Sequence, residues 1–324
     1  MGALPYAFGV PDALESSLLS TDLAGIVLRN PVILAAGTAG YLDETADVLD
    51  LSRIGAVITK SITARPRPGN KTWRIIETRA GMLNAVGLAN MGHEVFEREL
   101  GPRVARVPTT VIGSISGFSV EDYVAVAAAM ERIEAVPAVE LNMSCPNVSG
   151  GMEFCSTPEM AGLLLREVRP VLQRCRLFVK LSPRTYDIVG VAGACIDAGV
   201  DALTIANTYP AMAIDVETRR PRLSRTTGGL SGPAIHPIAL KLVHEVHQGV
   251  AMQAGVPIIG VGGVMRWEDA AEFILAGASA VQMGTAIFAD PRSPQRVAQG
   301  LARWVRRQGC ASLRELVGAM ETDR

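Results

Sequence analysis

The sequence predicts an α/β fold, a single (β/α)8 barrel of the TIM type. Eight short apolar runs alternate with stretches of helical periodicity along the 324 residues. Most runs are continuously apolar, as is typical of parallel strands that are covered on both faces, and eight strand–helix units close such a barrel. A doubly wound sheet is the alternative, but the first strand–helix turn lacks Gly-x-Gly-x-x-Gly. The predicted strands span residues 31–37, 56–62, 109–115, 138–144, 177–182, 202–208, 257–263 and 280–287.

Two helix starts fit this alternation. Ser119 precedes two acidic residues, and Thr157 precedes a proline at the first helical position, both of which are typical of helix N-termini. Because α/β barrels of about 250 residues form one domain, we expect residues 1–324 to be a single domain. The barrel core would span about residues 31–291, with the N-terminal segment and the C-terminal helices packed on it.

The composition excludes several classes of protein. The chain has 31 Lys and Arg residues and 32 Asp and Glu residues, so its net charge is −1. This balance argues against binding to nucleic acid or to a membrane surface. The five cysteines form no Cys-x-x-Cys pair, so neither a disulfide framework nor a zinc or iron–sulfur site is indicated. The first 20 residues lack a basic region typical of signal peptides, and the longest apolar stretch, residues 188–206, is interrupted by aspartates. We therefore expect a cytoplasmic protein.

Three strand–helix connections are long, and they span residues 63–92, 145–157 and 209–234. Loops beyond about 12–15 residues are usually functional or disordered. In a barrel these three follow strands, so they are expected on the catalytic face.

Glycines follow the seventh and eighth predicted strands, at Gly262, Gly263 and Gly284, the last followed by Thr285. Without a Cβ atom, backbone N–H groups can approach a phosphate closely. Barrels commonly bind phosphate after these two strands, so we predict a phosphate site here, with simple turn formation as the alternative.

Two lysines, Lys60 and Lys180, end apolar strands. An ammonium is costly to bury without a partner. The functional interpretation is that both lysines neutralise the charge of an anionic ligand; the alternative is that they reach solvent or pair with a carboxylate.

Asparagines and one cysteine complete the predicted site. Asn84, Asn142, Asn147 and Asn207 can each donate and accept hydrogen bonds, which suits a planar amide-like substrate, although asparagines also cap loops and turns. Cys145 directly follows the fourth strand and starts a long loop. A thiolate there could act as a general base or a nucleophile, whereas an isolated cysteine is more often an inert core residue.

The four histidines do not indicate a metal site. His244 and His247 share one helix face, but no further ligands are evident. We expect them, together with His93 and His236, to lie on solvated helix surfaces.

Taken together, the motifs resemble the catalytic subunit of the dihydroorotate dehydrogenases. The resemblance runs over about residues 23–291, and its segments occur in the family's order and spacing. That family is a set of FMN-binding (β/α)8 barrels that oxidise dihydroorotate to orotate in pyrimidine (UMP) biosynthesis. The segments are NPVILAAGT, GAVITKSITARPRPGN, GMLNAVGLAN, VELNMSCPNVSGG, VKLSP, IANT, GGLSGPAI, IIGVGG and VQMGTAIF.

The resemblance implies a role for each matching residue. Cys145 of SCPN would be the general base that removes the proton from C5 of (S)-dihydroorotate, while hydride passes from C6 to flavin N5. Lys180 would stabilise negative charge near flavin N1 and the C2 carbonyl. The implied substrate contacts are Lys60, Asn84, Gly87, Leu88, Asn142, Asn147, Asn207 and Thr208. The implied FMN contacts are Ala36, Gly37, Lys60, Ser61, Ser114, Asn142, Lys180, Ala206, Gly232, Gly262, Gly263, Gly284 and Thr285.

The sequence departs from the family pattern at two flavin contacts. Ala36 stands where a serine is common, and Ser114 stands where an asparagine is common. At both positions, the contact with the flavin would be made by the backbone or would be weaker.

The resemblance also implies a subclass and a partner. Membrane-linked relatives have a serine in place of Cys145 and an N-terminal membrane-binding extension, so this chain looks like the soluble class. KSITARPRPGN, GMLNAVGL and GGLSGPAI are most similar to the NAD-linked subclass, class 1B. There a second subunit with FAD and a [2Fe–2S] cluster accepts electrons from FMN, and we expect a homodimer within a heterotetramer.

Other functions remain as alternatives. A fumarate-linked dihydroorotate dehydrogenase and a dihydropyrimidine dehydrogenase are the nearest ones. A non-redox barrel lyase or isomerase would share the phosphate site without a flavin, and a non-catalytic scaffold would show neither flavin nor turnover.

Overall fold

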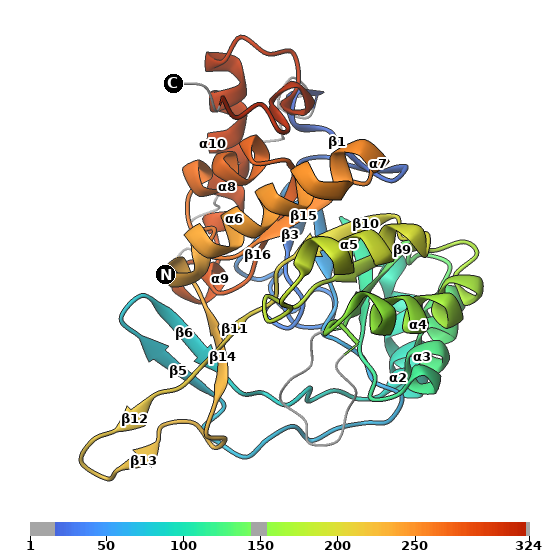
Figure 1. Ribbon diagram of the computed structural model, residues 1–324, viewed down its shortest axis with the longest axis vertical. Coiled ribbons are helices and arrows are strands. Elements are labelled where there is room, and N and C mark those ends of the chain that lie inside the picture. The colour runs from blue at the N-terminus through green and yellow to red at the C-terminus, as the bar shows by residue number, and fades with distance from the viewer. Residues whose placement is uncertain (1–16, 144–153, 322–324) are drawn as a thin grey trace, which may run out of the picture.

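Eight parallel strands close into a barrel, each bonded to its neighbours in chain order (Figure 1). The computed structural model describes residues 17–143 and 154–321. Every barrel strand overlaps one of the eight predicted runs, so the predicted (β/α)8 barrel is confirmed. The strands are β3 (Val32–Leu34), β4 (Ala56–Ile58), β7 (Thr110–Ile115), β8 (Ala138–Asn142), β9 (Arg176–Lys180), β10 (Ala202–Ile205), β15 (Ile258–Val261) and β16 (Ala278–Met283).

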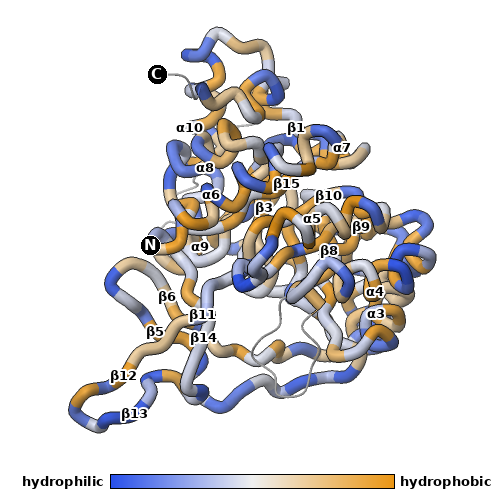
Figure 2. The backbone as a smooth tube through the Cα atoms, viewed as in Figure 1, coloured by the Kyte–Doolittle hydropathy of each residue, from blue (hydrophilic) through white to orange (hydrophobic). Residues whose placement is uncertain are grey.

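Helices cover the outside of the barrel, and a large apolar cluster lies between them and the strands. Hydropathy follows this arrangement, since the barrel strands are mostly apolar and the outward turns of the helices are polar (Figure 2). The longer helices are α3 (Val120–Arg132), α4 (Pro158–Val168), α5 (Ile188–Asp197), α6 (His236–Val246), α8 (Trp267–Leu275) and α10 (Ser293–Arg307). Short helices are α2 (His93–Val95), α7 (Met252–Ala254) and α9 (Ala286–Ala289). None of the described helices is long and apolar enough to cross a membrane.

Both predicted helix starts are confirmed by their caps. The Ser119 hydroxyl accepts a hydrogen bond from the Asp122 N–H at 3.3 Å, and the Thr157 hydroxyl accepts one from the Met160 N–H at 3.3 Å. These bonds satisfy N–H groups that have no partner within the helix, so α3 and α4 begin where the sequence indicates.

A hairpin of β1 (Thr21–Leu23) and β2 (Ile26–Leu28) closes the amino-terminal end of the barrel. Leu23 and Leu28 are buried in the same apolar cluster as Ala138 and Ala202, which begin β8 and β10. The barrel therefore opens toward the carboxyl ends of its strands.

A four-stranded antiparallel sheet stands over these carboxyl ends (Figure 1). Two of the predicted long loops supply it, which confirms their place on the catalytic face; most of the third, residues 145–157, lies outside the described residues. The sheet runs in the order β11 (Tyr209–Ala211), β14 (Gly228–Ser231), β6 (Gly81–Asn84) and β5 (Ile75–Thr78). A small hairpin of β12 (Ile214–Asp215) and β13 (Arg220–Pro221) projects beyond it.

The expectation that all histidines lie on solvated surfaces is wrong for two of them. His247 is buried, and a Cβ atom on Gly277 or Gly318 would collide with its ring. The His236 side chain is only 12% exposed. Its ring nitrogens lie 2.9 Å from the Gly262 carbonyl oxygen and 2.7 Å from Glu272 Oε2. His236 thus fixes the turn after β15.

Candidate active site

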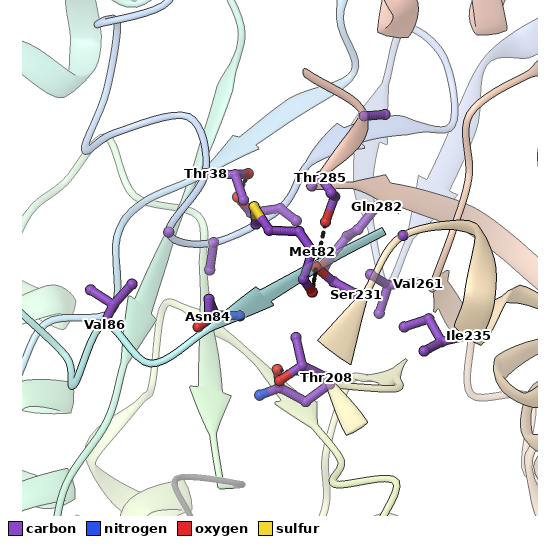
Figure 3. Close-up of a pocket in the computed structure, with 18 of the residues that line it drawn as sticks. Thr38, Met82, Asn84, Val86, Thr208, Ser231, Ile235, Val261, Gln282 and Thr285 are labelled. Atoms are coloured by element: carbon purple, nitrogen blue, oxygen red, sulfur yellow. Dashed lines mark hydrogen bonds between the residues drawn. The ribbon is translucent and has the colours of Figure 1, made fainter. Parts of the chain in front are cut away.

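A cavity of about 1330 Å³, its open mouth included, lies between the strand ends and the four-stranded sheet (Figure 3). The structure brings most predicted contacts to its wall. They are Ala36, Gly37, Lys60, Ser61, Asn84, Gly87, Leu88, Asn142, Lys180, Ala206, Asn207, Thr208, Gly232, Gly262, Gly263, Gly284 and Thr285.

Three predicted site residues are not placed at this wall. Cys145 and Asn147 lie outside the described residues. Ser114 is fully buried behind the wall, where its hydroxyl lies 2.9 Å from that of Ser61 and its N–H donates to the Thr59 hydroxyl. A role for Ser114 would therefore be exerted through Ser61, which does line the cavity.

The floor of the cavity carries the Lys180 ammonium at the end of β9. This side chain is only 6% exposed and donates a 2.9 Å hydrogen bond to Gln282 Oε1. Burial lowers the pKa of Lys180, and the negative charge of Glu140 opposes that effect. Desolvation disfavours a charged amine, so this cation depends on the polar groups beneath it.

A second cation, Lys60, follows β4 and lines the same cavity. Its pKa is lowered by burial and, to a smaller extent, by the positive charge of Arg74. The two lysines give the cavity a positive floor and wall, as an anionic ligand requires.

A chain of polar side chains crosses from β10 to β4. The Asn207 amide donates to Asn142 Oδ1 at 3.1 Å, and the Asn142 amide donates to the Ser61 hydroxyl at 3.4 Å. The Tyr123 hydroxyl donates to the Asn142 carbonyl oxygen at 2.7 Å, which holds the end of β8. Asn84 comes from β6, in the sheet that stands over the strand ends (Figure 3). Amide groups therefore reach the cavity from two sides.

Glycines make a narrow cradle at the ends of β15 and β16. Gly263 has φ +68°, and a Cβ atom there would lie 2.8 Å from the Gly232 carbonyl oxygen. Beside the cradle the Thr285 hydroxyl donates to the Ser231 hydroxyl at 2.6 Å (Figure 3). Backbone and hydroxyl groups that converge in this way are suited to bind phosphate oxygens.

The donor set fits FMN. The glycine cradle suits its phosphate, the small Ala35 and Ala36 side chains leave room for a flat ring, and Lys180 supplies a cation at the floor. Among the described residues no cluster of three His, Cys, Asp or Glu side chains is placed to hold a metal ion.

Several wall residues were not predicted individually. Ser231 and Gln282 fall inside GGLSGPAI and VQMGTAIF, so the motifs contained the signal. Thr38 and Met82 also line the cavity, and they fall inside NPVILAAGT and GMLNAVGLAN. Met82 lies on a strand of the sheet above it, which the apolar pattern did not reveal.

Comparison with known proteins agrees with this geometry. Residues 18–305 match the family described as dihydroorotate dehydrogenase. A protein of Pelobacter propionicus is 49% identical over 304 residues, which cover 94% of this chain and 98% of that protein. One of Geotalea uraniireducens is 48% identical over 94% of this chain and 98% of its own length, and one of Bacteroides thetaiotaomicron is 44% identical over 94% and 99%.

All three relatives are named dihydroorotate dehydrogenase B (NAD(+)), catalytic subunit. The match to the family extends over most of the chain, and its range includes the strand ends that form the cavity. The chain belongs to the dihydroorotate dehydrogenase family.

Proposed function

We propose that this chain oxidises (S)-dihydroorotate to orotate with FMN, as the catalytic subunit of an NAD-linked enzyme of pyrimidine synthesis. The observation that carries the proposal is the cavity at the barrel mouth, where two lysines, three asparagines and a glycine cradle meet. Dihydroorotate has a carboxylate and two ring amide groups, so this set of cations and amides complements it.

Residues at the strand ends would hold the cofactor. The phosphate would lie against Gly232, Gly263 and Gly284, and the ring would lie beside Ala36 and Ala206, all of which line the cavity. The Lys180 ammonium would stabilise the negative charge that develops on reduction, and a cation that is already fixed in place does so most strongly. FMN supplies the acceptor for the hydride that leaves C6 of the substrate.

The substrate would lie between the amides and Lys60. Its ring amide groups would form hydrogen bonds with Asn84, Asn142 and Asn207, and its carboxylate would pair with Lys60. We assign the base to Cys145, which follows β8 in the sequence. Its thiolate takes the C5 proton, and the departure of hydride from C6 leaves the C5=C6 double bond of orotate. A thiol is partly ionised near neutral pH because its ordinary pKa is about 8.5.

The two electrons must leave the chain. The relatives are named catalytic subunits of an NAD(+) enzyme, and this sequence has neither a Gly-x-Gly-x-x-Gly fingerprint nor a cysteine cluster. We propose that a partner subunit with FAD and a [2Fe–2S] cluster passes the electrons to NAD⁺ in the cytoplasm, within a heterotetramer built on a homodimer of this chain.

Acceptor assays test this function. The purified chain should be yellow, and dihydroorotate should bleach its flavin absorbance under anaerobic conditions. We expect turnover with artificial dyes, little reduction of NAD⁺ by the isolated chain, and NAD⁺ reduction once the partner is added. A colourless protein that cannot be reconstituted with FMN would favour a non-redox barrel, and rapid fumarate reduction would favour the fumarate-linked alternative.

A further inference from the structure

A polar layer lies inside the barrel at the base of the cavity, and its member Gln282 also lines the cavity. It consists of Glu140 on β8, Thr204 on β10 and Gln282 on β16, all of which are 0–1% exposed. Side chains that point to one face of a strand recur every second residue, so the next layer down comes two positions earlier on each strand. On these three strands it consists of Ala138, Ala202 and Ala280, which belong to one apolar cluster with Phe178 and Ile259 of the neighbouring strands.

Hydrogen bonds join this layer to Lys180. Glu140 Oε2 accepts from the Thr204 hydroxyl at 2.7 Å and from Gln282 Nε2 at 2.6 Å. Gln282 Oε1 accepts from the Lys180 ammonium at 2.9 Å. The Gln282 side chain is thus the bridge between a buried carboxylate and a buried cation.

The two charges fix the orientation of the Gln282 amide. A carboxylate only accepts and an ammonium only donates. Reversing the amide would place its oxygen against Glu140 and its NH₂ group against Lys180, so both bonds would be lost. The carboxylate therefore determines which atom Lys180 meets, although it does not touch Lys180.

A neutral bridge also leaves the cation available to a ligand. A lysine has three N–H donors, and Gln282 takes one of them. A carboxylate in the place of Gln282 would neutralise the cation directly at the floor. Within the described part of the chain, Glu140 is the charged group that acts on Lys180, and Lys60 is the other titratable residue that lines the cavity.

From this geometry we propose that Glu140 is a positioning residue that acts through Gln282. It keeps the Lys180 ammonium charged and fixed at the cavity floor, and in this way it raises the midpoint potential of the bound flavin. The inference rests on the proposed function, because it assumes that the chain binds FMN. The hydrogen bonds of the buried layer do not depend on that assumption.

The test measures the midpoint potential of FMN bound to the full-length chain, from pH 6 to pH 10. Glu140→Gln removes the charge at constant size. We expect the potential to fall, so that reduced FMN loses about tenfold in affinity relative to oxidised FMN, as for one hydrogen bond to a charged group. The pH above which the potential drops should also move down, because less negative charge supports the ammonium.

A second variant removes the bridge without changing any charge. Gln282→Met should lower the potential in the same direction, and it decides the question if Glu140→Gln does not retain FMN. Because Glu140 acts through Gln282, the double variant should fall no further than the lower of the two single variants. Additive losses would show that the two residues act separately and would contradict the proposal.

Thr204→Val is the matched control. It removes the hydrogen bond to Glu140 and the longer bond, 3.4 Å, that the Thr204 hydroxyl accepts from Gln282 Nε2, but it leaves the carboxylate and both bonds of the bridge. Its potential should stay at the wild-type value. An equal fall in this variant would attribute the effect to general disturbance of the buried layer and overturn the proposal. Wild-type potentials in both Glu140→Gln and Gln282→Met would also overturn it, whereas a wild-type chain that does not bind FMN would refute the proposed function instead.

Discussion

The Asn207 amide donates a hydrogen bond of 3.1 Å to Asn142 Oδ1, although 65 residues separate the two in the sequence. The bond joins the ends of β10 and β8 across the cavity wall. It orients the Asn142 side chain, so each asparagine depends on the other for the direction of its polar groups.

Asn207→Ala should therefore weaken orotate binding by about tenfold, the effect of losing one or two hydrogen bonds, while FMN is retained. Titration of the flavin absorbance with orotate measures this. Asn30→Ala is the control, because Asn30 is a buried, hydrogen-bonded amide just before β3, at the opposite end of the barrel. If both variants lose orotate affinity equally, Asn207 does not act at the site.

Cys145→Ala should retain FMN and lose about a hundredfold or more in the rate of flavin reduction by dihydroorotate, since general base catalysis contributes about that much. Cys145→Ser should recover some activity only at raised pH. Stopped-flow measurement of flavin bleaching gives the rate. Cys155→Ala is the matched control, because Cys155 is buried and its sulfur accepts from the Ser182 N–H. Near-normal reduction in Cys145→Ala at neutral pH would refute the assignment.

Gly263→Ala should weaken FMN binding by about tenfold or more, because its Cβ atom would crowd the Gly232 carbonyl oxygen and displace a backbone donor. Left-handed strain alone costs about 1–3 kcal/mol. Gly255→Ala separates the two effects, since Gly255 has φ +67° and nothing within 4 Å of an added Cβ. Both variants should lose thermal stability, and only Gly263→Ala should lose FMN, as measured by fluorescence of the released flavin.

Orotate affinity should decline with rising pH, and the decline should begin below the ordinary lysine pKa of 10.5 because burial and Arg74 lower the pKa of Lys60. A lowered pKa means that the charged form is lost at a lower pH, and with it the pairing with the ligand carboxylate. The full loss should amount to about tenfold to a hundredfold.

Arg74→Gln provides the test of that cause. Without the neighbouring positive charge, the pKa of Lys60 rises and the decline in orotate affinity should move to higher pH. Arg74→Lys keeps the charge and should leave the profile in place. An unchanged profile in Arg74→Gln would show that another group, such as Lys180 or Cys145, governs the pH dependence.

The sequence was sufficient to locate the eight barrel strands because parallel strands, covered on both faces, read as continuous apolar runs. It did not reveal the sheet over the cavity. The strands of that sheet are three or four residues long, and two of them, β6 and β14, contain glycine. In addition, β14 pairs with β6 across a large separation in the sequence. Short antiparallel strands of mixed polarity carry no periodic signal of their own.

The polar layer escaped sequence reasoning for a different reason. Glu140 is a single charged residue within an apolar strand, and its partner Gln282 is 142 residues away. Only the closure of the barrel brings them together. Lys60 and Lys180 could be predicted because they end their strands, whereas nothing in the local sequence distinguishes Glu140 from a residue at the surface.

In the polar layer of Glu140, Thr204 and Gln282, the residues that favour the proposed activity are not those that favour the stability of the barrel. Buried charged groups are often replaced by apolar ones at no cost to folding, or even with a gain. An apolar layer in place of Glu140, Thr204 and Gln282 would continue the alanines below it and remove the desolvation penalty of the carboxylate. Selection for thermostability alone would therefore erode this layer, and selection for activity would restore it, whereas the alanine layer and the hairpin beneath it can be optimised for stability without such a trade-off.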